Sequence, residues 1–502
     1  MFENQPKGLF ALALANTGER FGYYTMLAVF ALFLRANYGL TPGTAGIIYS
    51  SFLMFVYFFP LFGGMLADKF GFGKMVTTGI IIMFLGYLLL AVPLGGDSFA
   101  LAVMLVALVS IGFGTGLFKG NLQVMVGDLY NDAQYKDKRD SGFSIFYMAI
   151  NIGALFAPTA AIRIMEWAQS MGVSENDSYH FAFAVACASL ILSIAIYYAF
   201  RSTFRHVEGG KKKADGAAEV DTLSAAETKE RLIALLLVFG VVAFFWMSFH
   251  QNGLSLTYFA NEFTETSAEG VKAMAFNVWN LVAIIFMVYA AFSLFQGKTA
   301  KSRGIAALVI VVALAFLGYN YGALDGSVEV KAPIFQQFNP FYVVALTPVS
   351  LAIFGWLAAK NKEPKAPRKI AYGMIVAAVA FCLMLYASLT LPSPNEQAAL
   401  GEAAPRVSSY WLISTYLILT FGELLLSPMG ISFVSKVAPP KYKGACMGGW
   451  FVSTAIGNQL VMVGGILWGD LPLWSVWAVF AALCILAALF MFSIMKRLEK
   501  VC

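Results

Sequence analysis

Four charged residues lie within long apolar stretches of this 502-residue sequence: Glu19, Arg20, Lys119 and Glu423. A charge at the depth of a bilayer is costly, so it persists where it is paired or where it faces a cavity that holds water. Two acids and two bases carry no net charge, which suits a desolvated cavity. The alternative is that they form ion pairs that only fix helix packing. Apolar replacements of buried pairs are often equally stable, so we favour a functional site.

The first apolar stretch concentrates polar and aromatic residues on one helical face. Asn16, Glu19, Arg20, Tyr23 and Leu27 follow one another at spacings that bring them to the same side of a helix. The centre of that face combines an acid, a base and a phenol ring. We therefore expect the first helix to contribute to the site.

The elements that must position these residues are membrane-spanning helices. Hydrophobic residues make up 59% of the sequence and charged residues 12%, whereas a soluble domain carries about 25% charged residues. Stretches long enough to cross about 30 Å of hydrocarbon recur along the whole length. The apolar runs predict an all-α polytopic membrane protein with about fourteen spans, near 9–35, 45–67, 75–94, 99–128, 142–163, 179–200, 232–260, 275–295, 304–322, 338–359, 369–391, 409–435, 443–468 and 473–495.

A polar linker divides the chain into two parts. We expect an N-terminal six-helix bundle over 1–200, a basic linker over 201–231 and a C-terminal bundle over 232–502. The linker lysines at 211–213 either contact anionic lipid or only follow the positive-inside bias, and we favour the second interpretation. Most other Lys and Arg fall in loops on the same side, so both termini are expected in the cytoplasm.

Several functional classes find no support in the sequence. We see no nucleophile with a base and an orienting group, so we expect no enzymatic activity. The five cysteines lack metal-ligand spacing, and we expect no metal and no cofactor. The glycines of Gly112–Gly116 lie within an apolar span and lack the spacing of a phosphate loop. A net charge of +6 does not indicate a nucleic-acid partner, because the position of the charges matters more than their sum.

Ordered motifs along nearly the whole chain resemble those of one family. Asn16–Tyr24 reads NTGERFGYY, which is close to the pattern ExxERFxYY but lacks its first Glu. Gly116–Asn121 and Gly422–Pro428 look like the fourth- and tenth-helix motifs. Further matches are Gly63–Lys69, Phe143–Ala154, Phe338–Pro340 and Trp450. The sequence thereby resembles the proton-coupled oligopeptide transporter family of the major facilitator superfamily.

The resemblance implies a fold and an activity. The major facilitator fold has two six-helix bundles, here with two extra transmembrane helices, and a site between the bundles that opens to each side in turn. The implied function is a proton-coupled symporter that imports di- and tripeptides, as a monomer in the lipid of the bacterial cytoplasmic (inner) membrane. There are two alternatives. The protein could be a family member that carries another small anionic or drug-like solute, or a peptide sensor that does not transport.

The resemblance also implies roles for individual residues. Arg20 and Lys119 would face the carboxylate of the peptide, and Glu423 its amino group, which agrees with the opposite charges that a zwitterion requires. The complete set of expected substrate-binding residues is Arg20, Tyr23, Tyr57, Lys119, Tyr147, Asn151, Asn339, Glu423, Ser427 and Trp450. Proton coupling is expected to involve Glu19, Arg20, Lys119 and Glu423, with Glu19 as the first candidate and Glu423 as the second.

The sequence departs from the family pattern in two further ways. His250 stands where the family usually has an acid, and it either titrates near physiological pH or is a neutral, hydrogen-bonded group. The two extra helices, which bacterial relatives place between the sixth and seventh helices, are expected here after the seventh, at about 275–322. We expect an accessory role for them, because a pair leaves the sidedness of later helices unchanged.

Overall fold

The computed structural model of the protein describes residues 4–209, 223–297 and 299–501. Twelve of the described helices are long and apolar enough to cross a membrane. The other two expected spans correspond to α1 (Lys7–Tyr38), which carries buried charges, and to α16 (Lys443–Leu460) followed by α17 (Met462–Ile466). The prediction of an all-α membrane protein with about fourteen spans is therefore confirmed. The linker lysines at 211–213 lie outside the described residues, and their role stays a prediction.

The first six helices form one bundle. After α1 these are α2 (Pro42–Phe70), α3 (Phe72–Ala91), α4 (Ser98–Asp128), α5 (Arg139–Ser170) and α6 (Glu175–Ala199), with short 3-10 turns η1 (Lys136–Lys138), η2 (Arg201–Thr203) and η3 (Arg205–Val207). α1 packs against α5 and α6, while α4 packs against α2 and α3. Glycine permits the closest of these contacts, because a Cβ on Gly63 of α2 would lie 2.2 Å from the Gly116 carbonyl oxygen of α4.

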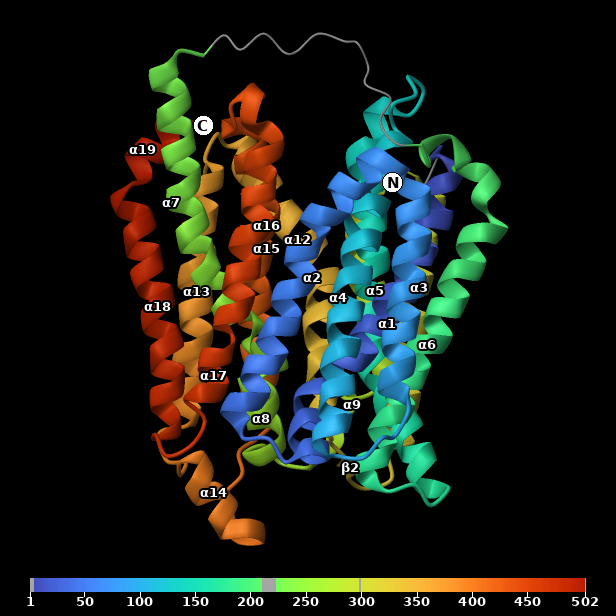
Figure 1. Cartoon of the computed structure of the whole chain (residues 1–502), viewed down its shortest axis with the longest axis vertical. Coiled ribbons are helices and arrows are strands. Elements are labelled where there is room, and N and C mark those ends of the chain that lie inside the picture. The colour runs from blue at the N-terminus through green and yellow to red at the C-terminus, as the bar shows by residue number, and fades with distance from the viewer. Residues whose placement is uncertain (1–3, 210–222, 298, 502) are drawn as a thin grey trace.

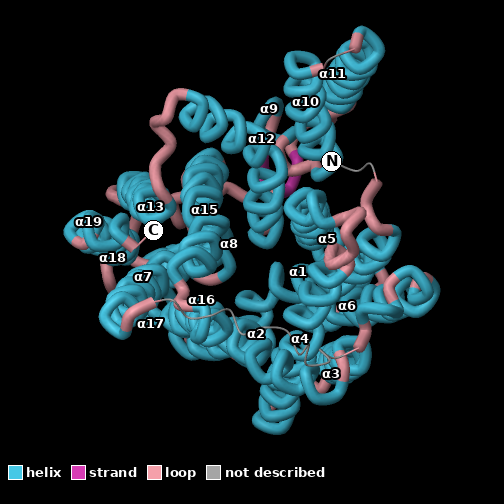
Figure 2. Tube along the Cα trace, turned by 90° about the horizontal axis from the view of Figure 1, so that it is seen from above, coloured by secondary structure: helices cyan, strands magenta, loops and turns pink. Residues whose placement is uncertain are grey.

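The second bundle holds the remaining spans. Its elements are α7 (Ala225–Phe249), η4 (His250–Gly253), α8 (Ser255–Glu262), β1 (Ser267–Ala268), α9 (Gly270–Met274), α10 (Val278–Gln296), α11 (Ala300–Gly322), β2 (Val328–Glu329), η5 (Ala332–Gln337), α12 (Phe338–Ala359), α13 (Ala366–Ala387), α14 (Pro394–Leu400), η6 (Gly401–Ala403), α15 (Tyr410–Val437), η7 (Pro440–Tyr442), α16, α17, α18 (Leu473–Ser493) and α19 (Met495–Lys500). α13 packs between α15 and α18, and α7 packs against α16 (Figure 2).

The helix pair α10 and α11 follows the seventh span. Figure 2 shows both helices projecting from the periphery of the molecule, beside α12. α10 contacts α12 of its own bundle and α5 of the other, where Trp279 meets Phe156 with ring centroids 5.3 Å apart. Only 11% of the most apolar window of α11 is buried, so this helix faces lipid on most sides.

The seventh span is broken near its middle. α7 ends at Phe249, a 3-10 turn follows, and α8 resumes at Ser255. Glycine is required at the break, because a Cβ on Gly253 would lie 1.7 Å from the hydroxyl oxygen of Tyr49. Gln251 donates from Nε2 to the Met247 carbonyl oxygen of α7 at 3.1 Å and to the Val461 carbonyl oxygen, between α16 and α17, at 3.0 Å. Discontinuous helices of this kind commonly form the binding sites of transporters.

The two ends of the molecule differ in how the bundles meet. Both chain termini lie at one end, at the top of Figure 1, which we call the terminal end. At the opposite end α2 packs against α17 so closely that a Cβ on Gly465 would lie 2.5 Å from the Pro42 carbonyl oxygen. Towards the terminal end α2 and α16 diverge (Figure 1). The bundles therefore approach each other most closely at the opposite end.

Charged side chains connect the bundles at the opposite end. Arg35 of α1 donates to Glu262 of α8, and Trp468 donates from Nε1 to the same carboxylate at 2.9 Å. The Arg35 guanidinium also lies over the ring of Tyr258, 4.7 Å from its centroid. We call Arg35, Glu262 and Trp468 the interbundle clamp, because they join the first helix to two segments of the second bundle.

Candidate functional site

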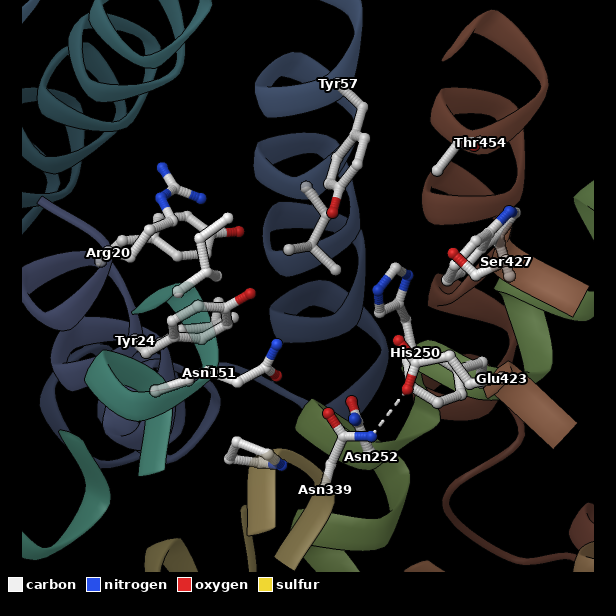
Figure 3. Close-up of a pocket in the computed structure, with 18 of the residues that line it drawn as sticks. Arg20, Tyr24, Tyr57, Asn151, His250, Asn252, Asn339, Glu423, Ser427 and Thr454 are labelled. Atoms are coloured by element: carbon white, nitrogen blue, oxygen red, sulfur yellow. Dashed lines mark hydrogen bonds between the residues drawn. The ribbon is translucent and has the colours of Figure 1, made fainter. Parts of the chain in front are cut away.

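A cavity of about 270 Å³ lies between the two bundles. Helices α1, α2, α4 and α5 line one wall, and α7, η4, α12, α15 and α16 line the other. Eleven of the sequence-predicted residues border it: Arg20, Tyr23, Tyr57, Lys119, Tyr147, Asn151, His250, Asn339, Glu423, Ser427 and Trp450. The remaining one, Glu19, does not. Residues that are hundreds of positions apart in the chain thus share one cavity (Figure 3).

Glu19 lies behind Arg20, as seen from the cavity, and forms an ion pair with it. The Arg20 guanidinium donates from Nε and Nη2 to the two carboxylate oxygens of Glu19, both at 2.5 Å. The side chains of this pair are 3% and 1% exposed. Arg20 also lies over the ring of Tyr23 at 4.4 Å. Such a bidentate pair satisfies both charges, so Glu19 neither reaches the cavity nor neutralises another cation in it.

Lys119 is the uncompensated cation of the site. Its ammonium group lies 4.1 Å from the centroid of the Tyr57 ring, where a cation–π contact replaces an ion pair. Among the described residues no carboxylate oxygen lies within ion-pair distance of Lys119. A desolvated ammonium group without an anion is costly, so this position favours an anionic ligand group.

Glu423 is the uncompensated anion on the other wall. Asn339 of α12 donates from Nδ2 to Glu423 Oε2 at 2.9 Å (Figure 3). The same nitrogen donates to Thr420 Oγ1 at 3.0 Å. The carboxylate is 9% exposed and has no cation within ion-pair distance in the part of the chain that the structure describes. The amide orients the carboxylate but leaves its charge unbalanced. A proton or an amino group can balance it.

The remaining predicted residues supply polar edges and aromatic surface. Asn151 uses Nδ2 to donate to the Tyr147 carbonyl oxygen at 3.0 Å, which leaves its Oδ1 for a ligand. The ring of Trp450 packs against α15, where a Cβ on Gly430 would meet it at 1.8 Å. Gly430 therefore lets this ring pack against α15 while bordering the cavity. Tyr147 is 46% exposed and Ser427 points towards the cavity (Figure 3).

His250 forms part of the second wall through a hydrogen-bonded chain. Its Nδ1 lies 2.5 Å from Asn458 Oδ1, and Asn458 Nδ2 donates across the bundle interface to the Leu53 carbonyl oxygen at 3.4 Å. The ring stacks on Trp246 with centroids 5.4 Å apart. An amide oxygen only accepts, so Nδ1 carries a proton. This contact is what the hydrogen-bonded interpretation of His250 requires.

Sequence reasoning missed several residues that line the cavity. These are Tyr24, Tyr49, Gln123, Asn252, Gln336 and Thr454, among others. Tyr24 belongs to the NTGERFGYY motif and Asn252 lies two residues after His250, so the motifs could have identified both residues. Gln336 was not, because it precedes α12 in η5 and donates to the Ala28 carbonyl oxygen of α1 at 3.1 Å. No metal-binding group of three or more His, Cys, Asp or Glu occurs in the described ranges.

The sequence is similar to those of several known transporters. The chain is 29% identical over 484 residues to the uncharacterized transporter YclF of Bacillus subtilis (strain 168), covering 91% of this chain and 87% of that protein. It is 27% identical over 491 residues to the di-/tripeptide transporter of Lactococcus lactis subsp. lactis, covering 91% and 89%. It is also 27% identical over 498 residues to the peptide transporter YePEPT of Yersinia enterocolitica, covering 93% and 89%.

Solved structures agree with the fold. A crystal structure of the peptide transporter POT in complex with sulfate superposes with a TM-score of 0.74 at 23% identity, covering 100% of this chain and 96% of that one. A POT family transporter in complex with 5-aminolevulinic acid gives a TM-score of 0.74 at 20% identity, covering 99% and 98%. The sequence model of the POT family matches residues 73–225 and 321–464, more than half of the chain. The protein is therefore a member of the POT family.

Proposed function

We propose that the protein is a proton-coupled symporter that imports di- and tripeptides by alternating access. One observation carries this proposal: Lys119 and Glu423, an uncompensated cation and an uncompensated anion, border the same cavity from opposite bundles. A peptide carries a carboxylate at one end and an ammonium group at the other. It would compensate both charges at once and join the two bundles. The names of the di-/tripeptide transporter and the peptide transporter among the relatives support this substrate class.

The contacts suggest how a peptide would lie in the cavity. Its carboxylate would face Lys119 and the Nη1 of Arg20, which does not take part in the bidentate pair with Glu19. Its ammonium group would pair with the Glu423 carboxylate in place of a proton. The free acceptor of Asn151 and the oxygen of Asn339 would meet the peptide backbone. Tyr23, Tyr57, Tyr147, Ser427 and Trp450 would surround the side chains.

Proton coupling would centre on Glu423. Glu19 was the first candidate from the sequence, but its bidentate contact with Arg20 compensates its charge. Within the described part of the chain Glu423 has an amide partner and no cation, so a proton and a peptide amine would compete for the same carboxylate. A shared site of this kind links proton occupancy to substrate release. Arg20 and Lys119 would set the charge of the first-bundle wall during that exchange, with Glu19 acting through its pair with Arg20.

The difference between the two ends supports alternating access. Close backbone contact and the interbundle clamp join the bundles at the opposite end, whereas α2 and α16 diverge at the terminal end. We take the terminal end as cytoplasmic, because most Lys and Arg of the loops belong to that side. The conformation is then the one that faces inward. We assign the protein, as a monomer with both termini in the cytoplasm, to the bacterial inner membrane.

Uptake by reconstituted protein tests the proposal. Proteoliposomes with an imposed inward proton gradient should accumulate a labelled dipeptide above its external concentration. A protonophore should abolish this accumulation, because a neutralised gradient leaves no driving force. Empty liposomes given the same gradient are the control. Accumulation that survives the protonophore would refute proton coupling, and the absence of any dipeptide flux would refute the substrate class.

Breaking the interbundle clamp should shift the conformational equilibrium. Arg35→Ala removes the cation from a pair whose side chains are 29% and 18% exposed. We expect a loss of about 1 kcal/mol, or roughly a fivefold decrease in the ratio of the form closed at the opposite end to the open form. Distances between spin labels on α1 and α17, measured by double electron–electron resonance, report this population.

A second ion pair at the same end provides the control for the clamp. Lys272 and Glu265 lie 2.5 Å apart, and both belong to the second bundle. Partial burial opposes ionisation of Glu265, but hydrogen bonds from Lys272 and Ser409 hold the pKa of its carboxyl below the ordinary value. Lys272→Ala breaks a comparable pair without touching the bundle interface. An equal population shift in both variants would contradict the role of the clamp.

A further inference from the structure

A second cavity lies away from the transport site, between α10 and α11. This groove measures about 780 Å³. The small residues Ala290 and Ala306 are 7% and 4% exposed, and they leave room between the two helices. Phe286 and Ile305 border the groove and are 59% and 55% exposed. Exposed apolar side chains on membrane-spanning helices are expected to meet lipid acyl chains.

One end of the groove is polar and basic. Ser293, Thr299, Lys301 and Ser302 border it there. Thr299 caps α11 by accepting from the Ser302 amide at 3.1 Å, so the other amides of the first turn remain available to an anion. No carboxylate of the described ranges lies within ion-pair distance of Lys301. The groove is thus apolar along its length and carries the unpaired positive charge of Lys301 at one end.

The basic end lies at the depth of lipid headgroups. β2, which follows α11, lies at the opposite end in Figure 1, so the turn between α10 and α11 lies at the terminal end. From Lys301 to Val309 the groove follows α11 for eight residues, or about 12 Å. This is close to the roughly 15 Å hydrocarbon depth of one leaflet. The dimensions match a headgroup with one acyl chain beneath it.

We propose that the groove between α10 and α11 binds an anionic phospholipid of the leaflet at the terminal end. Its phosphate contacts Lys301 and the hydroxyls of Thr299 and Ser302. One acyl chain lies between Phe286 and Ile305. The lipid fills a gap that a protein neighbour leaves open, since α11 packs mainly against α10. Tyr289 borders the groove and donates to the Val344 carbonyl oxygen of α12 at 3.1 Å, which connects the lipid to a helix of the transport site.

Native mass spectrometry of the purified full-length protein tests this site. At matched concentrations and acyl chains, phosphatidylglycerol should bind at least fivefold more tightly than phosphatidylcholine. Lys301→Gln should weaken phosphatidylglycerol binding about fivefold, the effect of one basic residue at a lipid surface. Ala306→Phe, which fills the groove, should weaken the binding of both lipids. Lys362→Gln, which changes an exposed lysine of the same end away from the groove, should leave both unchanged.

Specific outcomes would overturn the assignment. Equal affinity for the two lipids, or equal losses in Lys301→Gln and Lys362→Gln, would show that the groove selects no anionic headgroup. Displacement of the lipid by millimolar glycerol phosphate would show that the site binds a soluble phosphate without an acyl chain. A dimer that disappears in Ala306→Phe would identify a second copy of the chain as the occupant. Native mass spectrometry measures lipid binding and not transport, so its result does not depend on whether the proposed function is correct.

Discussion

Replacing Lys119 by alanine is expected to reduce gradient-driven accumulation of dipeptide by at least tenfold while preserving exchange of peptide for peptide. Lys119 is the uncompensated cation of the cavity, and its ammonium group rests on the ring of Tyr57. Without it, the peptide carboxylate loses a charge-assisted contact worth about 1.5–3 kcal/mol. Exchange requires only that the site binds and releases peptide on each side of the membrane. Net accumulation also requires that the proton and the peptide bind and leave the cavity in a fixed order, because each changes the net charge of the cavity.

Two variants separate the charge of Lys119 from its packing. Lys119→Arg retains the positive charge and should retain part of the accumulation. Tyr57→Phe keeps the ring beneath the ammonium group and removes only a hydroxyl, so it should change uptake less than Lys119→Ala does. Accumulation and counterflow are measured on the same proteoliposomes. Wild-type accumulation in Lys119→Ala would remove this residue from the mechanism.

The sequence predicted the helices and eleven of the residues that border the cavity, because both depend on local signals. Apolar runs of about 20 residues identify spans, and the expected extra pair at 275–322 corresponds to α10 and α11. The motifs around Lys119, Asn339 and Glu423 pointed to residues that the structure brings to one cavity. Charges within apolar helices were informative because a bilayer tolerates few of them.

Other features depended on contacts that no local pattern records. At the break after Phe249 the hydroxyl of Tyr49 lies close to Gly253, and these two residues lie on different bundles. The adjacency of Glu19 and Arg20 did not indicate a closed pair, since neighbouring side chains on a helix usually do not face each other. Their bidentate contact removes Glu19 from the cavity wall. The charge balance of the site therefore had to come from three-dimensional geometry.

Glu423→Gln is expected to weaken uptake of dipeptides with a free amino group at least tenfold, while uptake of N-acetylated dipeptides changes less than about twofold. The Glu423 carboxylate accepts a hydrogen bond from the Asn339 amide at 2.9 Å and has no cationic partner among the residues that the structure describes. A glutamine occupies the same volume and keeps a partner for Asn339, so packing is preserved. The ion pair with the ammonium group is lost, and its loss corresponds to about 1.5–3 kcal/mol. An acetylated amine carries no charge and makes no such pair.

Competition for labelled peptide in counterflow measures both affinities without a proton gradient, and so it separates substrate binding from coupling. Glu402→Gln changes an exposed carboxylate far from the cavity lining and should have no effect on either peptide. In the same variant of Glu423, the response of uptake to an imposed proton gradient should also disappear, because proton and amine compete for one carboxylate. Equal losses for free and acetylated peptides would place the amino group elsewhere. If uptake by Glu423→Gln still responded to the proton gradient, Glu19 would become the candidate for proton coupling.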